Sequence, residues 1–181
     1  MTFIVRAAVI ASAVALSLPA AAAPAKQLIN KSVKVSYTVN LITKAPSGTI
    51  YNTSFAVTGA GYVSSSGRVF IQGTRTDARK GAETVRVGPG ENYKGLKTSV
   101  TANGNVVRFI QSSVGGSGAV QVTVTVDPAT YSSCTVNVVY GLSGKQKASY
   151  PGINEPGPYE MQSYSIANNS CSVVNGNIFG D

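Results

Sequence analysis

The residues of this chain that could carry chemistry are two cysteines and a few carboxylates, since histidine is absent. Without an imidazole, Ser-His-Asp and Cys-His catalysis and histidine-dependent metal sites are excluded. Paired carboxylates could act on a glycosidic bond, and the acids available for such a pair are Asp77, Glu83, Glu91, Asp127, Glu155 and Glu160. Asp127 precedes Pro128 and is better explained by a turn, and the others fall in expected loops or at strand ends. We therefore predict no enzyme and no catalytic residue.

Cys134 and Cys171 could form a disulfide, bind a metal or act as thiols. Zinc requires four ligands, and there is no histidine to join the two cysteines. A thiol nucleophile would lack the imidazole that usually activates it. Because an even number of cysteines in an exported chain favours a disulfide, we expect one bond between Cys134 and Cys171. We expect no metal and no cofactor.

The N-terminal residues predict that the chain is exported. A single cation, Arg6, precedes an apolar run from Ala7 to Leu18, and a stretch of alanines follows. This order is typical of a cleaved signal peptide, and the apolar run is shorter than the roughly 20 residues that span a bilayer as a helix. We expect cleavage between Ala22 and Ala25, and hence a periplasmic, cell-surface or secreted protein.

The rest of the chain predicts one all-β domain, with residues 1–23 as the signal peptide and residues 24–181 as the domain. Short runs rich in Val, Thr, Tyr and Ile are separated by Gly, Pro, Ser and Asn, and no helical period follows the leader. Apolar and polar residues alternate in the segments Ser32 to Thr43, Ala119 to Val126 and Cys134 to Tyr140. Each of these strands should bury one face in an antiparallel sheet.

Less regular strands and turns complete the predicted domain. The further strands are expected at Thr49 to Val57, Arg68 to Gln72, Thr84 to Val87, Leu96 to Thr101, Asn105 to Gln111, Met161 to Ala167 and Cys171 to Val174. Asn103-Gly104 and Asp127-Pro128 predict tight turns, and loops are expected at Thr74 to Ala82, Gly88 to Gly95 and Gly141 to Tyr159. About ten short strands favour a single antiparallel β-sandwich, with a small β-barrel as the alternative.

The positive charge is concentrated in the first half of the domain. Residues 26–108 hold twelve cations and three anions, a net charge of +9, whereas residues 109–181 hold two cations and four anions, a net charge of −2. A basic field outside the cell attracts polyanions. Net charge also keeps a small domain dispersed, and on composition alone solubility is the favoured explanation. The candidate anionic-ligand contacts, in or beside two expected loops, are Arg75, Arg79, Lys80, Arg86, Lys94 and Lys97.

These features predict a non-enzymatic envelope or secreted protein that acts by binding or assembly, through its basic first half, on an anionic envelope polymer. The partner would be an acidic polysaccharide, a lipid phosphate or another envelope protein. The alternative is a strand-exchanging subunit or chaperone, because Ser32 to Leu41 resembles the donor strand of exported adhesion and pilus subunits. The late cysteine pair departs from the early pair of those subunits. A carboxylate-dependent hydrolase is the third hypothesis.

Overall fold

The computed structural model of the chain describes residues 23–77, 81–87, 92–93, 96–113, 119–140, 150–151 and 158–180. Residues 1–22 of the expected signal peptide lie outside this part. The described residues form one short 3-10 helix, η1 (Lys26–Leu28), and eleven strands. The strands are β1 (Lys31–Lys44), β2 (Ile50–Val63), β3 (Val69–Asp77), β4 (Gly81–Val87), β5 (Asn92–Tyr93), β6 (Leu96–Asn103), β7 (Val106–Ser113), β8 (Ala119–Val126), β9 (Cys134–Tyr140), β10 (Tyr150–Pro151) and β11 (Pro158–Asn175). In the described part, no helix is long and apolar enough to span a bilayer.

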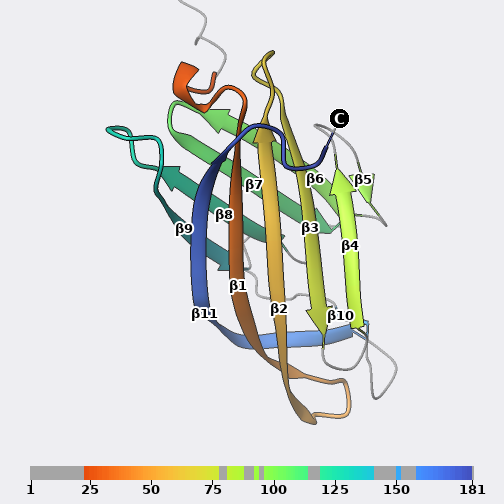
Figure 1. The fold of residues 1–181 in the computed structure, drawn as a ribbon. Coiled ribbons are helices and arrows are strands. Elements are labelled where there is room, and N and C mark those ends of the chain that lie inside the picture. Colours follow the sequence, from red (N-terminus) through yellow and green to blue (C-terminus); the bar gives the residue numbers. More distant parts are fainter. Residues whose placement is uncertain are drawn as a thin grey trace, which may run out of the picture.

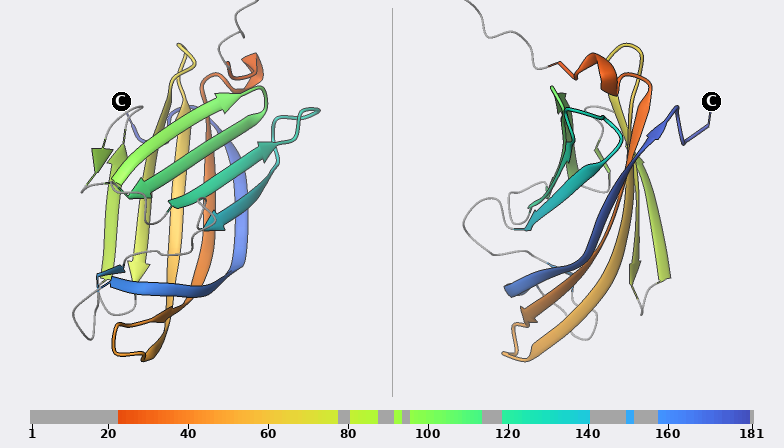
Figure 2. Two further views of the ribbon diagram at one scale, coloured as in Figure 1. Left: turned by 180° about the vertical axis from the view of Figure 1, so that it is seen from behind. Right: turned by 60° about the vertical axis from the view of Figure 1, so that its left-hand side comes forward.

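The strands form two antiparallel sheets that face each other (Figure 1, Figure 2). The six-stranded sheet has the order β10-β11-β1-β2-β3-β4, and the five-stranded sheet has the order β5-β6-β7-β8-β9. The strands of the five-stranded sheet run obliquely across the other sheet, and neither sheet closes on itself (Figure 2). The predicted all-β sandwich is therefore confirmed, and the barrel alternative is wrong.

β1 occupies the middle of the six-stranded sheet, because it pairs with β11 on one side and with β2 on the other. Its alternating residues separate as predicted: Val39 is fully buried between the sheets, and Lys34 on the opposite face is exposed. Burial raises the pKa of Tyr37 to about 12, so this phenol stays protonated at neutral pH. The buried inner face of β1 comprises Val33, Val35, Tyr37, Val39 and Leu41.

The two sheets approach each other closely at Gly61 of β2. A Cβ atom at this position would lie 2.8 Å from two ring carbons of Phe109, a residue of β7 in the opposite sheet. Gly59, on the same face, leaves room for Val35 of β1, whose Cγ2 would lie 3.1 Å from an added Cβ. Glycine is used in strands where another chain segment must come this close. Gly61 therefore admits a large aromatic ring between the sheets, and Gly59 admits the Val35 side chain of the neighbouring strand.

Several strands are longer than the sequence predicts. β2 continues to Val63 and β3 to Asp77, and β4 begins at Gly81, so the loop expected at Thr74 to Ala82 is wrong for residues 74–77 and 81–82. β11 joins the two strands expected near the C-terminus into one strand of 18 residues. Serine, threonine and asparagine favour turns through their own side chains, but pairing with the neighbouring strand supplies the backbone hydrogen bonds here and extends the ladder.

β11 contains a β-bulge opposite Tyr37 of β1. Two of its residues, Asn168 and Asn169, oppose this one residue, and Asn168 takes the left-handed backbone conformation with φ 53°. Asparagine tolerates this conformation better than most residues. The Nδ2 group of Asn169 donates a hydrogen bond to the backbone oxygen of Val136 in β9, at 3.3 Å. The bulge thus connects the six-stranded sheet to the edge of the five-stranded sheet.

The predicted disulfide joins Cys134 of β9 to Cys171 of β11, with the two Cα atoms 5.9 Å apart. It ties the first cysteine's strand to the last strand, as the sequence predicts. It lies near the Asn169 contact in β11, so the two sheets are held together along one side by a covalent bond and a hydrogen bond.

Both predicted turns are confirmed. Gly104, between β6 and β7, has φ 55°, and Asp127 begins the turn between β8 and β9. Its carboxylate accepts hydrogen bonds from the Thr130 hydroxyl at 2.7 Å and from the Ala129 amide at 3.0 Å. These hydrogen bonds, the one from Thr130 having the larger effect, hold the pKa of Asp127 below its usual value. This carboxylate is therefore accounted for by the turn.

Candidate functional site

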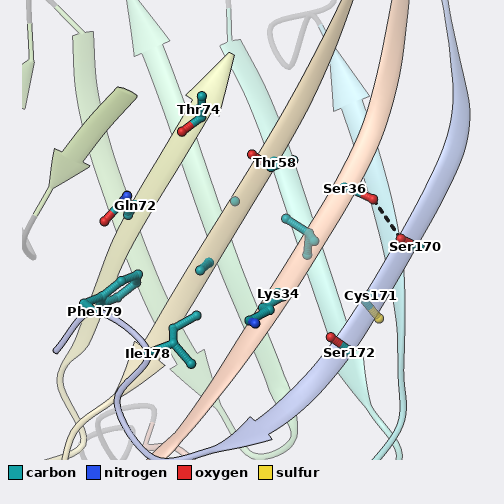
Figure 3. Close-up of a pocket in the computed structure, with 13 residues that line it drawn as sticks. Lys34, Ser36, Thr58, Gln72, Thr74, Ser170, Cys171, Ser172, Ile178 and Phe179 are labelled. Carbon is teal, nitrogen blue, oxygen red and sulfur yellow. Dashed lines mark hydrogen bonds between the residues drawn. The ribbon is translucent and has the colours of Figure 1, made fainter. Parts of the chain in front are cut away.

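The outer face of the six-stranded sheet carries a groove with a volume of about 520 Å³ (Figure 3). Its floor is formed by β1, β2, β3 and β11, and one side is formed by the segment that follows β11. The period-two alternation of each strand sends its polar residues to this face while the apolar residues fill the core. The groove is therefore a direct consequence of the strand pattern and of the order in which the strands pair.

A row of hydroxyl side chains crosses the floor of the groove, and we call Ser170, Ser36, Thr58 and Thr74 the hydroxyl row. Pairing sets Ser36 of β1 between Ser170 of β11 and Thr58 of β2, and Thr58 pairs with Thr74 of β3. The Oγ atoms of Ser36 and Ser170 lie 2.8 Å apart in a hydrogen bond. Because neighbouring strands are about 4.8 Å apart, the row offers a polar group at about this interval across the sheet.

The adjacent row contains the cation of the groove. Lys34 of β1 pairs with Ser172 of β11 and with Ala60 of β2, and Ala60 pairs with Gln72 of β3. Lys34 is exposed, and neither aspartate nor glutamate is among the residues that line the groove. Arg86 of β4 pairs with Gln72, so the backbone of a second basic residue lies beside this row. The described lining of the groove therefore carries a positive charge, that of Lys34.

The segment after β11 crosses the outer face of the sheet and borders the groove (Figure 1, Figure 3). It is anchored at Ser32, whose hydroxyl donates to the backbone oxygen of Gly176 at 2.7 Å and accepts from the amide of Ile178 at 3.4 Å. Ser32 is fully buried. Beyond this anchor, Ile178 and Phe179 line the groove, and Phe179 lies beside Gln72. An apolar side thus adjoins the polar floor.

Of the carboxylates considered for catalysis, the structure describes the side chains of Asp127 and Glu160, and neither lines the groove. Asp127 belongs to the turn between β8 and β9, and Glu160 pairs with Lys44 at one end of β1. Within the described ranges, no three His, Cys, Asp or Glu side chains lie together as a possible metal site. No protein-family model, curated protein or solved structure matches this chain. What the groove binds must therefore be inferred from its own residues.

The structure places three of the six predicted basic contacts. Arg75 lies on β3 and Arg86 on the neighbouring strand β4, whereas Lys97 lies on β6 in the other sheet. Only the backbone of these three residues is described. Arg86 is in register with Gln72 of the groove floor, Arg75 is in register with Val57 of the core-facing row, and Lys97 lies on the other sheet. The remaining predicted contacts, which lie outside the described residues, are Arg79, Lys80 and Lys94.

Sequence reasoning does not predict the groove itself. The alternation of β1 does place Lys34 and Ser36 on the exposed face, and this is the signal that the sequence contains. The other members of the hydroxyl row join Ser36 only through the order of strands in the sheet. Ile178 and Phe179 follow the last strand and belong to no periodic pattern. Non-local pairing, which local patterns do not reveal, therefore creates the site.

Proposed function

We propose that this protein is an exported, non-enzymatic binding domain that attaches to an anionic polymer of the cell envelope through the outer face of its six-stranded sheet. The observation that carries the proposal is the groove around Lys34, whose described lining includes a cation and hydroxyl groups and no carboxylate. Three of the four strands that form its floor, β1 to β3, come from the basic first half of the domain. Most of the groove floor is therefore built from the basic part of the chain.

The strength of such binding follows from repeated weak contacts. An exposed ion pair contributes only about 0–1 kcal/mol, so one lysine cannot hold a ligand tightly. A polymer presents many charges, and the net charge of +9 over residues 26–108 attracts all of them. Salt screens charges that are separated by more than about 10 Å at 0.1 M ionic strength. Binding by this face should therefore depend strongly on salt.

The double variant Lys34→Gln/Arg86→Gln is expected to elute from an immobilised polyphosphate resin at a clearly lower salt concentration than the unmodified protein. Lys34 lines the groove, and Arg86 is in register with Gln72 of the groove floor. The matched control is Lys145→Gln/Lys147→Gln, which removes the same charge from the second half of the chain. It should elute with the unmodified protein.

Salt gradients on the three folded proteins provide the measurement. Retention of the unmodified protein that does not change between low and high salt would contradict the proposed function. Equal losses in the two double variants would mean that net charge alone causes retention, and would also count against a binding face in the first half.

A further inference from the structure

We infer that the outer-face groove binds an acidic polysaccharide: Lys34 contacts a carboxylate of the polymer, the hydroxyl row contacts its hydroxyl groups, and Phe179 covers a sugar ring. The inference rests on the proposed function and narrows its ligand to one chemical class. The inference rests on residues that all line this one groove, namely Lys34, Thr58 and Phe179.

The hydroxyl row suits a ligand that is itself rich in hydroxyl groups. A serine or threonine hydroxyl donates one hydrogen bond and accepts others, and a sugar hydroxyl does the same. The row runs from β11 to β3, perpendicular to the strands, with a group at each strand. A polymer that lies along the row therefore meets a new hydrogen-bonding group about every 4.8 Å.

The apolar side of the groove suits the face of a sugar ring. A pyranose ring carries its hydroxyl groups around the edge and exposes C–H groups on its faces. Phe179 and Ile178 lie next to the polar floor rather than in the core, and the Ser32 hydrogen bonds fix the segment that presents them. A ring stacked on Phe179 can keep its edge hydroxyls directed toward Gln72 and the hydroxyl row.

The charge of the groove separates an acidic polysaccharide from other polyanions. Among the described residues that line the groove, Lys34 is the one that is charged, so a ligand with widely spaced carboxylates fits better than one with dense phosphates. Binding of DNA draws on many phosphate contacts, and single strands also stack on several aromatic rings. A lipid surface is bound by an apolar face inserted among the acyl chains, whereas the floor of this groove is polar.

Isothermal titration with galacturonate oligomers and with their methyl esters tests the inference, because the two ligands share a backbone and differ in charge. The unmodified protein should bind the acid form about twofold to fivefold more tightly than the ester, the effect of one exposed ion pair. Lys34→Gln should weaken binding of the acid form by about the same factor and remove this preference over the ester. Lys44→Gln is the matched control, since Lys44 is exposed on the same strand outside the groove.

Thr58→Val tests the hydroxyl row separately from charge. This change keeps the shape of the side chain and removes one hydrogen-bonding group, and we expect roughly threefold to tenfold weaker binding of both ligands. The control is Thr125→Val, since Thr125 is exposed on β8 of the other sheet, and this variant should bind as the unmodified protein does.

Four other outcomes of these experiments would contradict the inference, each in a different part. If Lys34→Gln and Lys44→Gln are both folded, as judged by their thermal transitions, and bind galacturonate with equal affinity, the groove is not the binding site. Absence of galacturonate binding together with salt-sensitive retention on polyphosphate would overturn the polysaccharide and leave the proposed function standing. Displacement of galacturonate by DNA or by anionic vesicles at equal charge concentration would favour those ligands instead. Absence of binding to every polyanion would contradict the proposed function as well.

Discussion

Deletion of the residues up to and including Leu41 is expected to abolish the cooperative unfolding transition of the domain. β1 is hydrogen-bonded to strands on both sides, β11 and β2, so its loss leaves each of these two long strands unpaired along one edge. The deletion also removes six buried side chains from the core, Leu28 and the five of β1. At about 1.5–3 kcal/mol for each, these side chains contribute roughly 9–18 kcal/mol, which is comparable to the whole stability of a typical domain, about 5–15 kcal/mol.

Thermal unfolding followed by circular dichroism measures the effect of this deletion. A shorter deletion, ending at Ala25, is the control, because it removes the hydrogen bonds of Ala23 and Ala25 to Gly104 and leaves β1 intact. It should keep a sharp transition. A folded, monomeric remainder after the longer deletion would contradict the role of β1 as an integral strand. That outcome would favour the strand-exchanging subunit, in which Ser32 to Leu41 serves a partner molecule.

Replacement of both cysteines by alanine should lower the free energy of unfolding by about 3–4 kcal/mol in the chain-entropy model. The disulfide closes a loop with a sequence separation of 37 residues. It also joins β9 to β11, strands of different sheets, so its loss frees one side of the sandwich.

Urea unfolding of the oxidised protein and of the Cys134→Ala/Cys171→Ala variant measures this difference. The unmodified protein in reducing agent is the control and should unfold with the variant. A loss smaller than about 1 kcal/mol would contradict the prediction. It would mean that the sheets are held together by packing contacts such as that between Gly61 and Phe109.

The parts of the fold that the sequence predicts are those in which local pattern and tertiary packing agree. β1, β8 and β9 alternate strictly, and each has one buried face. Asp127 forms its turn with its own side chain, through Thr130 and Ala129. The disulfide is predictable from an even cysteine count in a chain expected to be exported, and the absence of histidine argues against a metal site or an activated thiol without considering the fold.

The parts that the sequence does not predict depend on partners far away in the chain. Asn168 and Asn169 have the composition of a loop, yet they form a bulge inside β11 because Tyr37 opposes both. The predicted basic contacts depend on charge and on expected loops alone. These two criteria include Lys97, although it lies on the other sheet. Lys34 is omitted because a single lysine on an alternating strand has no local feature that distinguishes it. Lys34 lies in a groove only because of the residues that the neighbouring strands place beside it.

The most direct test of the binding face is a nuclear magnetic resonance titration of the folded protein with galacturonate oligomers. We expect the largest amide shift changes at Lys34, Ser36, Thr58 and Gln72, on the three adjacent strands of the groove floor, and at Phe179 beside them. Residues of β8 and β9 on the opposite sheet should not respond. Changes confined to the five-stranded sheet, or spread evenly over the exposed lysines, would contradict a binding site on the outer face of the six-stranded sheet.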